Sequence, residues 1–229
     1  MTQFHFVEDY EKLVAELVAT LPLDEALARA VGGDYQRTGQ IQCAALRYLG
    51  LRDGQSLIDL GCGSGRLAAA LGQSFAIDYL GIDIVPALLD YAASKAPPDY
   101  RFVCNRTLHI PAPDACADML CAFSVFTHLL HHETWLYLED IRRVLRPGGR
   151  LVLSFLEFAS TAHWSVFAAS TEAHRTGALP HLNQFIERSV IDLWCAKLGY
   201  VREQFIDGDA APWGETGALW QSVAVLRRP

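Results

Sequence analysis

The chain of 229 residues is acidic and moderately apolar: 19 Lys and Arg side chains against 26 Asp and Glu give a net charge of −7 at pH 7 with neutral histidines. Hydrophobic residues make up 51% of the sequence, which is enough for one domain with its own core and excludes a disordered chain or a disulfide-dense scaffold. Affinity for nucleic acid comes mostly from clustered Lys and Arg, so the negative balance favours a small molecule or a protein as partner.

The cysteines and the start of the chain bear on location. The six cysteines are scattered, with no CxxC pair, and no basic segment near Met1 runs into an apolar stretch. We therefore expect reduced thiols and a cytoplasmic protein. The segment 151–170 carries only Glu157 as a charge. Its first residues follow a Pro-Gly-Gly turn and are strand-like, so we expect a strand and then a loop rather than a membrane helix.

The first fifty residues show helical patterning and no strand. Apolar residues recur at helical spacing over 4–20, and two further helical patterns follow before residue 50. We expect residues 1–50 to form a helical N-terminal cap that belongs to the same domain as residues 51–229.

Strands alternate with helices after the cap. Short apolar runs separated by helical patterns predict strands at 56–59, 79–83, 100–104, 117–123 and 150–155. Such alternation gives a mostly parallel sheet with helices on both faces. Two more strands, at 200–205 and 221–226, are joined by a loop too short for a helical crossover. The sequence therefore predicts an α/β fold with a seven-stranded, mostly parallel sheet whose last strand is antiparallel.

A glycine-rich turn joins the first predicted strand to its helix, in the run Leu57-Ile-Asp59-Leu-Gly61-Cys-Gly63-Ser-Gly65. Glycine at such a turn lets the backbone approach a ligand closely. A second acid, Asp83, ends the next strand, where a carboxylate can accept hydrogen bonds from both hydroxyls of a ribose. The combination indicates a site shaped for a nucleoside.

The spacing of the glycines separates the kinds of nucleotide site. A dinucleotide site uses G-x-G-x-x-G/A, whereas here the third glycine comes one residue earlier and Arg66 follows it, which disfavours a dehydrogenase. The phosphate-binding string G-x-x-x-x-G-K-[ST] is not found. Neither Ser64 nor Ser154 lies in the G-x-S-x-G context of serine hydrolases.

The sequence resembles the class I S-adenosylmethionine-dependent methyltransferases, whose first motif is an acidic residue followed by x-G-x-G-x-G. The run from Asp59 to Gly65 matches that motif, and Leu145-Arg-Pro-Gly-Gly-Arg-Leu151 resembles the turn into the family's fifth strand. Further matches lie between them in the family's order. The resemblance implies a Rossmann-like class I methyltransferase fold, with S-adenosylmethionine (SAM) as cofactor and S-adenosylhomocysteine (SAH) as its product.

The resemblance also implies roles for individual residues. Asp59 and the glycine turn would hold the methionine part of the cofactor, Asp83 the ribose and Asn105 the adenine. Phe123 and Ser124 would lie beside the sulfonium. The full set expected to bind the cofactor is Asp59, Gly61, Cys62, Gly63, Gly65, Asp83, Ile84, Asn105, Phe123 and Ser124.

No catalytic residue is assigned, because methyl transfer by alignment needs no dedicated base. His128 is the candidate for a base or for orienting the substrate, and a packed, hydrogen-bonded histidine is the alternative. The cluster of His128, His131, His132 and Glu133 lacks the order H-E-x-x-H, so we expect no metal site.

Contacts with the acceptor are expected from two stretches. Tyr35 and Arg37 precede the glycine motif, where related enzymes often close over the cofactor. A long loop is predicted over 157–183, and loops of this length often form lids or binding surfaces. Within it His163 and Trp164 are the candidates.

We therefore predict methyl transfer from SAM to an O, N or C atom of a small-molecule acceptor by in-line displacement. The alternatives are a protein or RNA methyltransferase, with the acidic balance against RNA, and a cofactor-binding module that acts without catalysis. We expect a monomer or a homodimer, and contact with neither nucleic acid nor a membrane.

Overall fold

A computed structural model describes residues 7–178, 182–214 and 216–229. Three helices come first, α1 (Val7–Thr20), α2 (Leu23–Val31) and α3 (Tyr35–Tyr48). The helical patterning predicted for the first fifty residues is confirmed over residues 7–48, while residues 4–6 of that pattern lie outside the described part. Asp34 caps α3, because its side chain accepts a hydrogen bond of 2.8 Å from the backbone nitrogen of Arg37.

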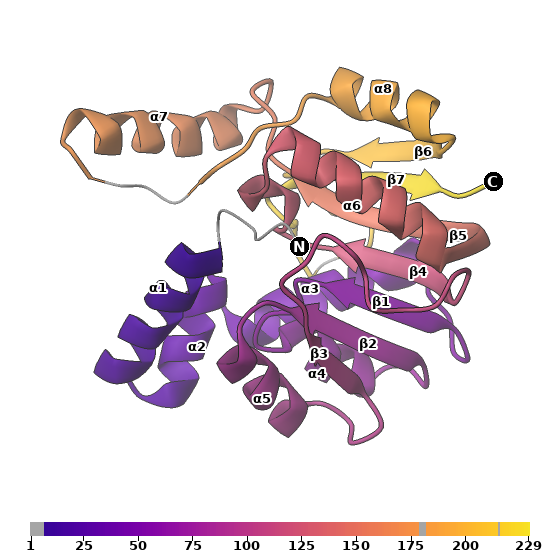
Figure 1. The fold of residues 1–229 in the computed structure, drawn as a ribbon, viewed down its shortest axis with the longest axis horizontal. Coiled ribbons are helices and arrows are strands. Elements are labelled where there is room, and N and C mark those ends of the chain that lie inside the picture. The colour runs from indigo at the N-terminus through magenta and orange to yellow at the C-terminus, as the bar shows by residue number, and fades with distance from the viewer. Residues whose placement is uncertain (1–6, 179–181, 215) are drawn as a thin grey trace.

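A seven-stranded sheet lies at the centre of the protein (Figure 1), in the order β3-β2-β1-β4-β5-β7-β6. β7 is antiparallel to β5 and to β6, and the other neighbouring strands are parallel. The predicted fold class is confirmed. The strands are β1 (Ser56–Leu60), β2 (Asp78–Asp83), β3 (Arg101–Cys104), β4 (Ala117–Ala122), β5 (Leu145–Phe155), β6 (Val201–Ile206) and β7 (Ser222–Arg227).

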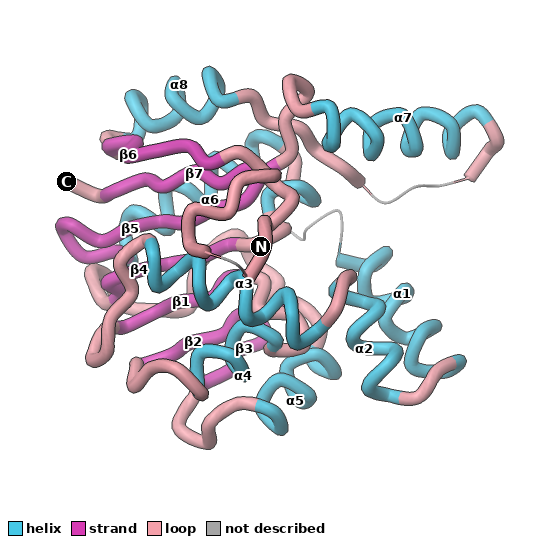
Figure 2. Tube along the Cα trace, turned by 180° about the vertical axis from the view of Figure 1, so that it is seen from behind, coloured by secondary structure: helices cyan, strands magenta, loops and turns pink. Residues whose placement is uncertain are grey.

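Helices cover both faces of this sheet. α6 (His131–Val144) and α8 (Arg188–Leu198) lie in front of it in Figure 1, whereas α3 and α4 (Arg66–Gly72) lie in front in the opposite view of Figure 2. One buried cluster joins the sheet to α6 and α8, and another joins it to α3 and α4. The strands β1, β2, β4 and β7 are buried on both faces and are therefore mostly apolar, which is why the sequence predicts them well.

One long segment differs from the sequence-based expectation. α7 (Thr161–Arg175) occupies most of the stretch predicted as a loop over 157–183, and it projects away from the sheet (Figures 1 and 2). Within α7 only His163 is buried. Its sequence lacks the sustained apolar repeat of 3.6 residues that a buried helix shows, and the pattern therefore resembles that of a loop.

α3 and α4 cross in direct contact at Gly39. A Cβ atom at this position would lie 2.3 Å from the carbonyl oxygen of Arg66, the first residue of α4. The close approach of the two backbones therefore requires glycine at this position. The crossing holds α3 against the helix that follows the glycine-rich turn.

Candidate functional site

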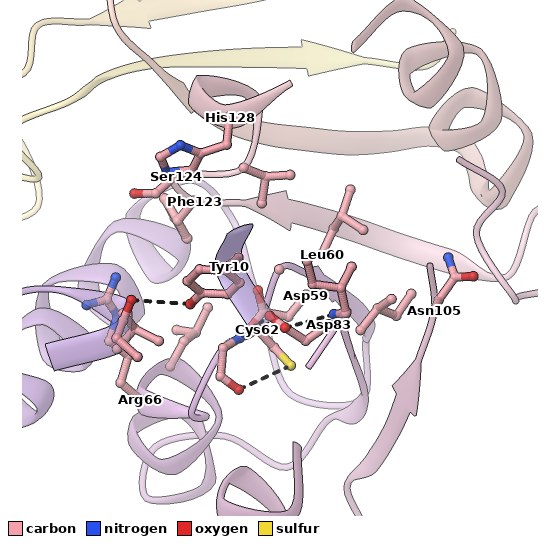
Figure 3. Close-up of a pocket in the computed structure, with 18 of the residues that line it drawn as sticks. Tyr10, Asp59, Leu60, Cys62, Arg66, Asp83, Asn105, Phe123, Ser124 and His128 are labelled. Carbon is pink, nitrogen blue, oxygen red and sulfur yellow. Dashed lines mark hydrogen bonds between the residues drawn. The ribbon is translucent and has the colours of Figure 1, made fainter. Parts of the chain in front are cut away.

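A cavity lies where the parallel strands β1, β2 and β4 end, the edge at which ligands bind in open α/β sheets (Figure 3). Asp59 lines it from β1, Asp83 from β2, and Phe123 from the residue after β4. β1 pairs with both β2 and β4, so these three strand ends are neighbours in the sheet. The residues expected to bind the cofactor all line this cavity except Gly65.

Neighbouring side chains leave no room for a Cβ atom at Gly61 and Gly63 of the turn. Gly61 and Gly63 have positive φ angles of 72° and 54°. A Cβ atom on Gly61 would lie 2.4 Å from Cγ2 of Val125, and one on Gly63 would lie 2.7 Å from Cγ1 of Val31. Larger residues would therefore push the turn away from both neighbours.

Gly65 has a different structural reason. It is the N-cap of α4, with φ of 80°, and a Cβ atom there would lie 2.6 Å from Cβ of Ala92 on α5 (Pro86–Lys95). The structure thus explains this glycine by helix packing. It does not place Gly65 on the cavity wall, where the sequence-based expectation put it.

Asp83 links the end of β2 to the glycine turn. Its Oδ2 accepts a hydrogen bond of 2.9 Å from the backbone N–H of Gly63, and its Oδ1 accepts two from the N–H groups of Ile84 and Val85 at 2.8 and 3.1 Å. Burial raises the pKa of this carboxyl group, although the three backbone bonds oppose the shift. A carboxylate offers about four acceptor positions, so capacity remains for a ligand hydroxyl.

Asp59 is a second buried carboxyl group on the cavity wall. The hydroxyl of Tyr79 donates to its Oδ2 at 2.7 Å, and the thiol of Cys121 donates to its Oδ1 at 3.4 Å. Burial raises the pKa of Asp59 to about 6. At neutral pH the group is therefore mostly ionised, and it gives the cavity negative charge.

Among the polar residues that line the cavity, Tyr10, Gln42, Arg66 and Tyr137 were not anticipated from the sequence. Tyr10, on α1, donates a hydrogen bond from its hydroxyl to the carbonyl oxygen of Ala30 at 3.3 Å. The Arg66 guanidinium donates to the carbonyl oxygen of Gly32 at 2.5 Å, and no carboxylate of the described residues lies within ion-pair distance of it. Burial lowers the pKa of Arg66.

Gln42 reaches the cavity from α3. It is only 4% exposed, and it lines the cavity. A polar residue inside the buried face of a helix is the sequence signal that could have found it, because burial without a partner is costly. Arg66 carried a signal as well, since it directly follows the glycine motif.

The side chain of Asn105 is engaged within its own turn. Its Nδ2 donates to the carbonyl oxygens of Thr107 and His109 at 3.0 and 2.8 Å, and its Oδ1 accepts from Oγ1 of Thr107 at 2.8 Å. Figure 3 shows it apart from the other labelled side chains. The structure therefore does not leave this amide open toward adenine as expected, although the residue lies on the cavity wall.

Neither acceptor candidate on α3 lines the cavity. The hydroxyl of Tyr35 donates a hydrogen bond of 3.1 Å to the carbonyl oxygen of Ser64, on the outer side of the glycine turn, and burial raises its pKa to about 12. Arg37 is exposed in the first turn of α3.

The two acceptor candidates on α7 also lie away from the cavity lining. His163 is fully buried, and both ring nitrogens are bonded: Nδ1 accepts from the backbone N–H of Glu157 at 3.1 Å, and Nε2 donates to the carbonyl oxygen of Trp220 at 2.8 Å. This arrangement differs from the expected contact with substrate. Trp164 is half-exposed and joins a cluster of aromatic rings.

His128 lies on the cavity wall at the end of the short helix η1 (Phe126–His128) (Figure 3). Its Nδ1 donates a hydrogen bond of 2.8 Å to the carbonyl oxygen of Leu182. In the neutral ring this bond makes Nε2 the unprotonated nitrogen.

The other members of the histidine cluster serve the start of α6. Oε2 of Glu133 accepts a hydrogen bond from the N–H of Leu130 at 2.7 Å, and Nε2 of His131 donates to the carbonyl oxygen of Phe185 at 3.0 Å. Among the described residues, no group of three or more His, Cys, Asp or Glu side chains is arranged to hold a metal ion. No described helix combines the length and the apolar character needed to cross a membrane.

Residues 58–153, which run from β1 almost to the end of β5, match a methyltransferase domain family. This segment of the chain is a methyltransferase domain, and the sheet around it has the class I methyltransferase fold. The matched region contains the glycine turn, Asp83 and the cavity residues after β4.

Characterised methyltransferases are similar to this chain over part of their length. The 27-O-demethylrifamycin SV methyltransferase of Amycolatopsis mediterranei is 36% identical over 46% of this chain and 40% of its own length. The demethylmenaquinone methyltransferase of Beutenbergia cavernae is 29% identical over 68% of this chain and 66% of its own. The chain spans less than half the length of the first curated relatives, 33–47% of each.

A solved methyltransferase has the same fold. The magnesium protoporphyrin IX methyltransferase of Synechocystis, with bound SAH, superposes with a TM-score of 0.62 over all of this chain and 90% of its own. The two sequences are 17% identical, so this likeness concerns the fold. The SAH bound in that structure is the product that SAM leaves after methyl transfer, which agrees with SAM as the cofactor of the methyltransferase domain found here.

Proposed function

We propose that this methyltransferase transfers the methyl group of SAM to an O, N or C atom of a small-molecule acceptor. The observation that carries the proposal is the set of polar groups in one cavity. Two buried carboxyl groups, Asp59 and Asp83, lie with the Arg66 guanidinium, which has no carboxylate partner in the described part of the chain. This set complements a ligand with hydroxyls, a carboxylate and a positive charge.

Each group has a role that its surroundings support. Asp83 has spare acceptor capacity for the ribose hydroxyls. Arg66 and the amide of Gln42 both line the cavity and are placed to receive the carboxylate and amine of the methionine part. The Arg66 guanidinium bonds the carbonyl oxygen of Gly32 and has no carboxylate partner in the described part of the chain. Asp59 adds a negative field that suits a sulfonium cation.

When bound, SAM supplies an activated methyl group that an acceptor atom displaces in line. The protein contributes alignment, which is worth about 7–11 kcal/mol when the reacting atoms are held about 3–3.5 Å apart. His128 is the proposed residue for orienting the acceptor or taking its proton, because it lies on the cavity wall with its ring fixed by the bond to Leu182.

The aromatic cluster at the base of α7 supports an acceptor with apolar rings. Phe158 stacks on Phe185 with ring centroids 4.4 Å apart, and Phe167 and Trp164 extend the cluster, both partly exposed. The N–H of Gln184 donates to the carbonyl oxygen of Thr127, the residue before His128. This bond connects the segment that carries Phe185 to the short helix η1, which borders the cavity. Two relatives are named as a 27-O-demethylrifamycin SV methyltransferase and a demethylmenaquinone methyltransferase, which supports a small-molecule acceptor.

RNA is a weaker alternative, because arginines near the end of α6 have carboxylate partners. Arg143 pairs with Asp114 and Asp140, and Arg146 pairs with Asp118. Arginines engaged in this way offer less positive charge to a phosphate backbone.

We further propose that residues 1–50 and 51–229 act as one unit, supported by Tyr10 and Gln42 of the cap, which share the cavity with Asp83. The six cysteines are unpaired, which supports a cytoplasmic location. A monomer or a homodimer remains the proposed state.

The test is calorimetric titration of the wild-type protein and Asp83→Ala with SAM, SAH and NADH. We expect saturable binding of SAM and SAH, loss of both in Asp83→Ala, and no binding of NADH. Circular dichroism of Asp83→Ala shows whether this variant is folded. Arg66→Met tests the same site through a residue whose substitution leaves the turn of Asp83 intact. Absence of SAM and SAH binding by the folded wild-type protein would contradict the proposal and favour a non-catalytic interaction module.

A further inference from the structure

Ser124 holds a backbone conformation that costs free energy. Its φ angle is 60°, in the left-handed region, and it lies on the cavity wall two residues after β4. A residue other than glycine in this region is strained, and the conformation persists only when its surroundings enforce it. The enforcing contacts are therefore functionally informative.

A network of three side chains provides these contacts. The backbone N–H of Ser124 donates a hydrogen bond of 2.7 Å to Oγ of Ser154, which is buried in β5. The hydroxyl of Ser154 donates to Oε1 of Gln221 at 2.6 Å. The hydroxyl of Ser124 donates to the same oxygen at 3.3 Å. The side-chain amide oxygen of Gln221 thus accepts a hydrogen bond from both hydroxyls.

Gln221 is itself held in place from two sides. The preceding residue, Trp220, also has a left-handed φ, of 69°. Its N–H donates to the carbonyl oxygen of Gly208 at 2.8 Å, and its own carbonyl oxygen accepts from the buried ring of His163 at 2.8 Å. A Cβ atom on Gly208 would lie 2.0 Å from that carbonyl oxygen. The position of the Gln221 side chain is therefore set by the loop between β6 and β7 and by the first turn of α7.

The conformation of Ser124 sets the wall opposite the glycine turn. The next residue, Val125, comes so close to Gly61 that a Cβ atom there would lie 2.4 Å from Cγ2 of Val125. A rotation of the backbone at Ser124 would move Val125 relative to Gly61. It would also move Phe123, the neighbour on the other side, which lines the same cavity.

We propose that Gln221 is a positioning residue for methyl transfer: by collecting the hydroxyls of Ser154 and Ser124, it holds the wall beside the reacting methyl group at a fixed distance from the glycine turn. Gln221 itself is not among the residues that line the cavity, so it acts through Ser124. This inference rests on the proposed function, because the geometry of the wall matters for the reaction only if the cavity holds SAM.

The experiment compares Gln221→Met, which removes the acceptor oxygen, with Gln221→Glu, which keeps an oxygen at the same reach. Gln204→Met on β6 is the matched control, because no hydrogen bond of its side chain is found among the described residues. Calorimetry with SAH gives affinity, and hydrogen–deuterium exchange of the unliganded protein reports on residues 123–128. We expect Gln221→Met to weaken SAH binding about tenfold and to speed exchange at 123–128. The substitution removes the hydrogen bonds that hold Ser124 in its strained conformation. Gln221→Glu should stay within about threefold of the wild type.

Three results would overturn the inference. Gln221→Met could bind SAH and exchange as the wild type does, Gln221→Glu could be as weak as Gln221→Met, or Gln204→Met could lose as much affinity. A wild-type protein that does not bind SAH would instead overturn the proposed function, and the positioning role with it. Exchange in the unliganded variants distinguishes this case, because it still shows whether Gln221 holds Ser124.

Discussion

The backbone N–H of Gly63 donates a hydrogen bond of 2.9 Å to Oδ2 of Asp83, across 20 positions of sequence. This bond joins the turn after β1 to the end of β2. A substitution of Asp83 therefore disturbs the turn and the proposed ribose contact together. Variants that test contacts with the methionine end and with the nucleoside end of the ligand separately have to be made elsewhere on the cavity wall.

Arg66→Met separates the methionine end of the ligand from the rest. We expect it to weaken SAH and SAM binding by about tenfold to a hundredfold, because a charge-assisted hydrogen bond to a carboxylate is worth about 1.5–3 kcal/mol. Calorimetry with 5′-methylthioadenosine, which has no carboxylate, should give the same affinity for variant and wild type. Arg37→Met, on the exposed side of α3, is the control. Equal losses for 5′-methylthioadenosine and SAH would show that Arg66 supports the cavity generally.

The raised pKa of Asp59, about 6, predicts a pH dependence of cofactor discrimination. SAM carries a sulfonium charge that SAH lacks, and both share the same amino-acid groups. As pH rises from 5 to 7, Asp59 loses its proton, so the ratio of SAM affinity to SAH affinity should increase by at least about threefold. Titrations at each pH measure the ratio. In Asp59→Asn the ratio should rise less with pH. The rise that remains is the part due to Asp83, because the pKa of Asp83 is also raised.

The same shift has a consequence for folding. The pKa of Asp59 lies above its ordinary value of 3.8, so between about pH 4 and 6 the folded state binds more protons than the unfolded state. This group therefore lowers the free energy of unfolding as pH rises through that window. Urea unfolding should show that the free energy of unfolding of Asp59→Asn, relative to that of the wild type, increases as pH rises from 4 to 6. A constant difference would contradict the assignment.

Two glycines with nearly the same φ angle form a matched pair. Gly65 and Gly54 have φ of 80° and 79°, but a Cβ atom on Gly65 would lie 2.6 Å from Ala92, whereas nothing lies within 4 Å of one on Gly54. Gly54→Ala should cost about 1–2 kcal/mol from backbone strain alone. Gly65→Ala should cost about 1–3 kcal/mol more, because α5 must shift. Urea unfolding of both variants measures the difference, and equal losses would show that α5 yields freely.

The sequence predicted the sheet and the strand-end residues of the site because their physical causes are local. β1 is buried on both faces and reads as one apolar run, and its last residues lead directly into the glycine turn. Asp59 and Asp83 occupy the ends of adjacent strands, so strand order alone brings them together.

The residues contributed by the N-terminal helices are not marked by a motif. Tyr10 and Gln42 reach the cavity only because α1 and α3 pack over it, and the one sequence signal is the polar side chain of Gln42 within the buried face of its helix. Asn105 matched the family pattern, yet its amide is bonded within its own turn, since short polar side chains compete for nearby backbone groups. α7 escaped prediction because only His163 of its residues is buried.

The contact between Gly39 and Arg66 constrains how the N-terminal helices can vary. A side chain at position 39 would push α4 outward, and α4 starts directly after Gly65, so the turn that faces the ligand would be displaced with it. Position 39 touches no ligand, yet its size fixes the separation of the two helix axes at their crossing. A chimera that takes its first helices from a relative would therefore need glycine at this crossing to keep the turn in register with Asp83.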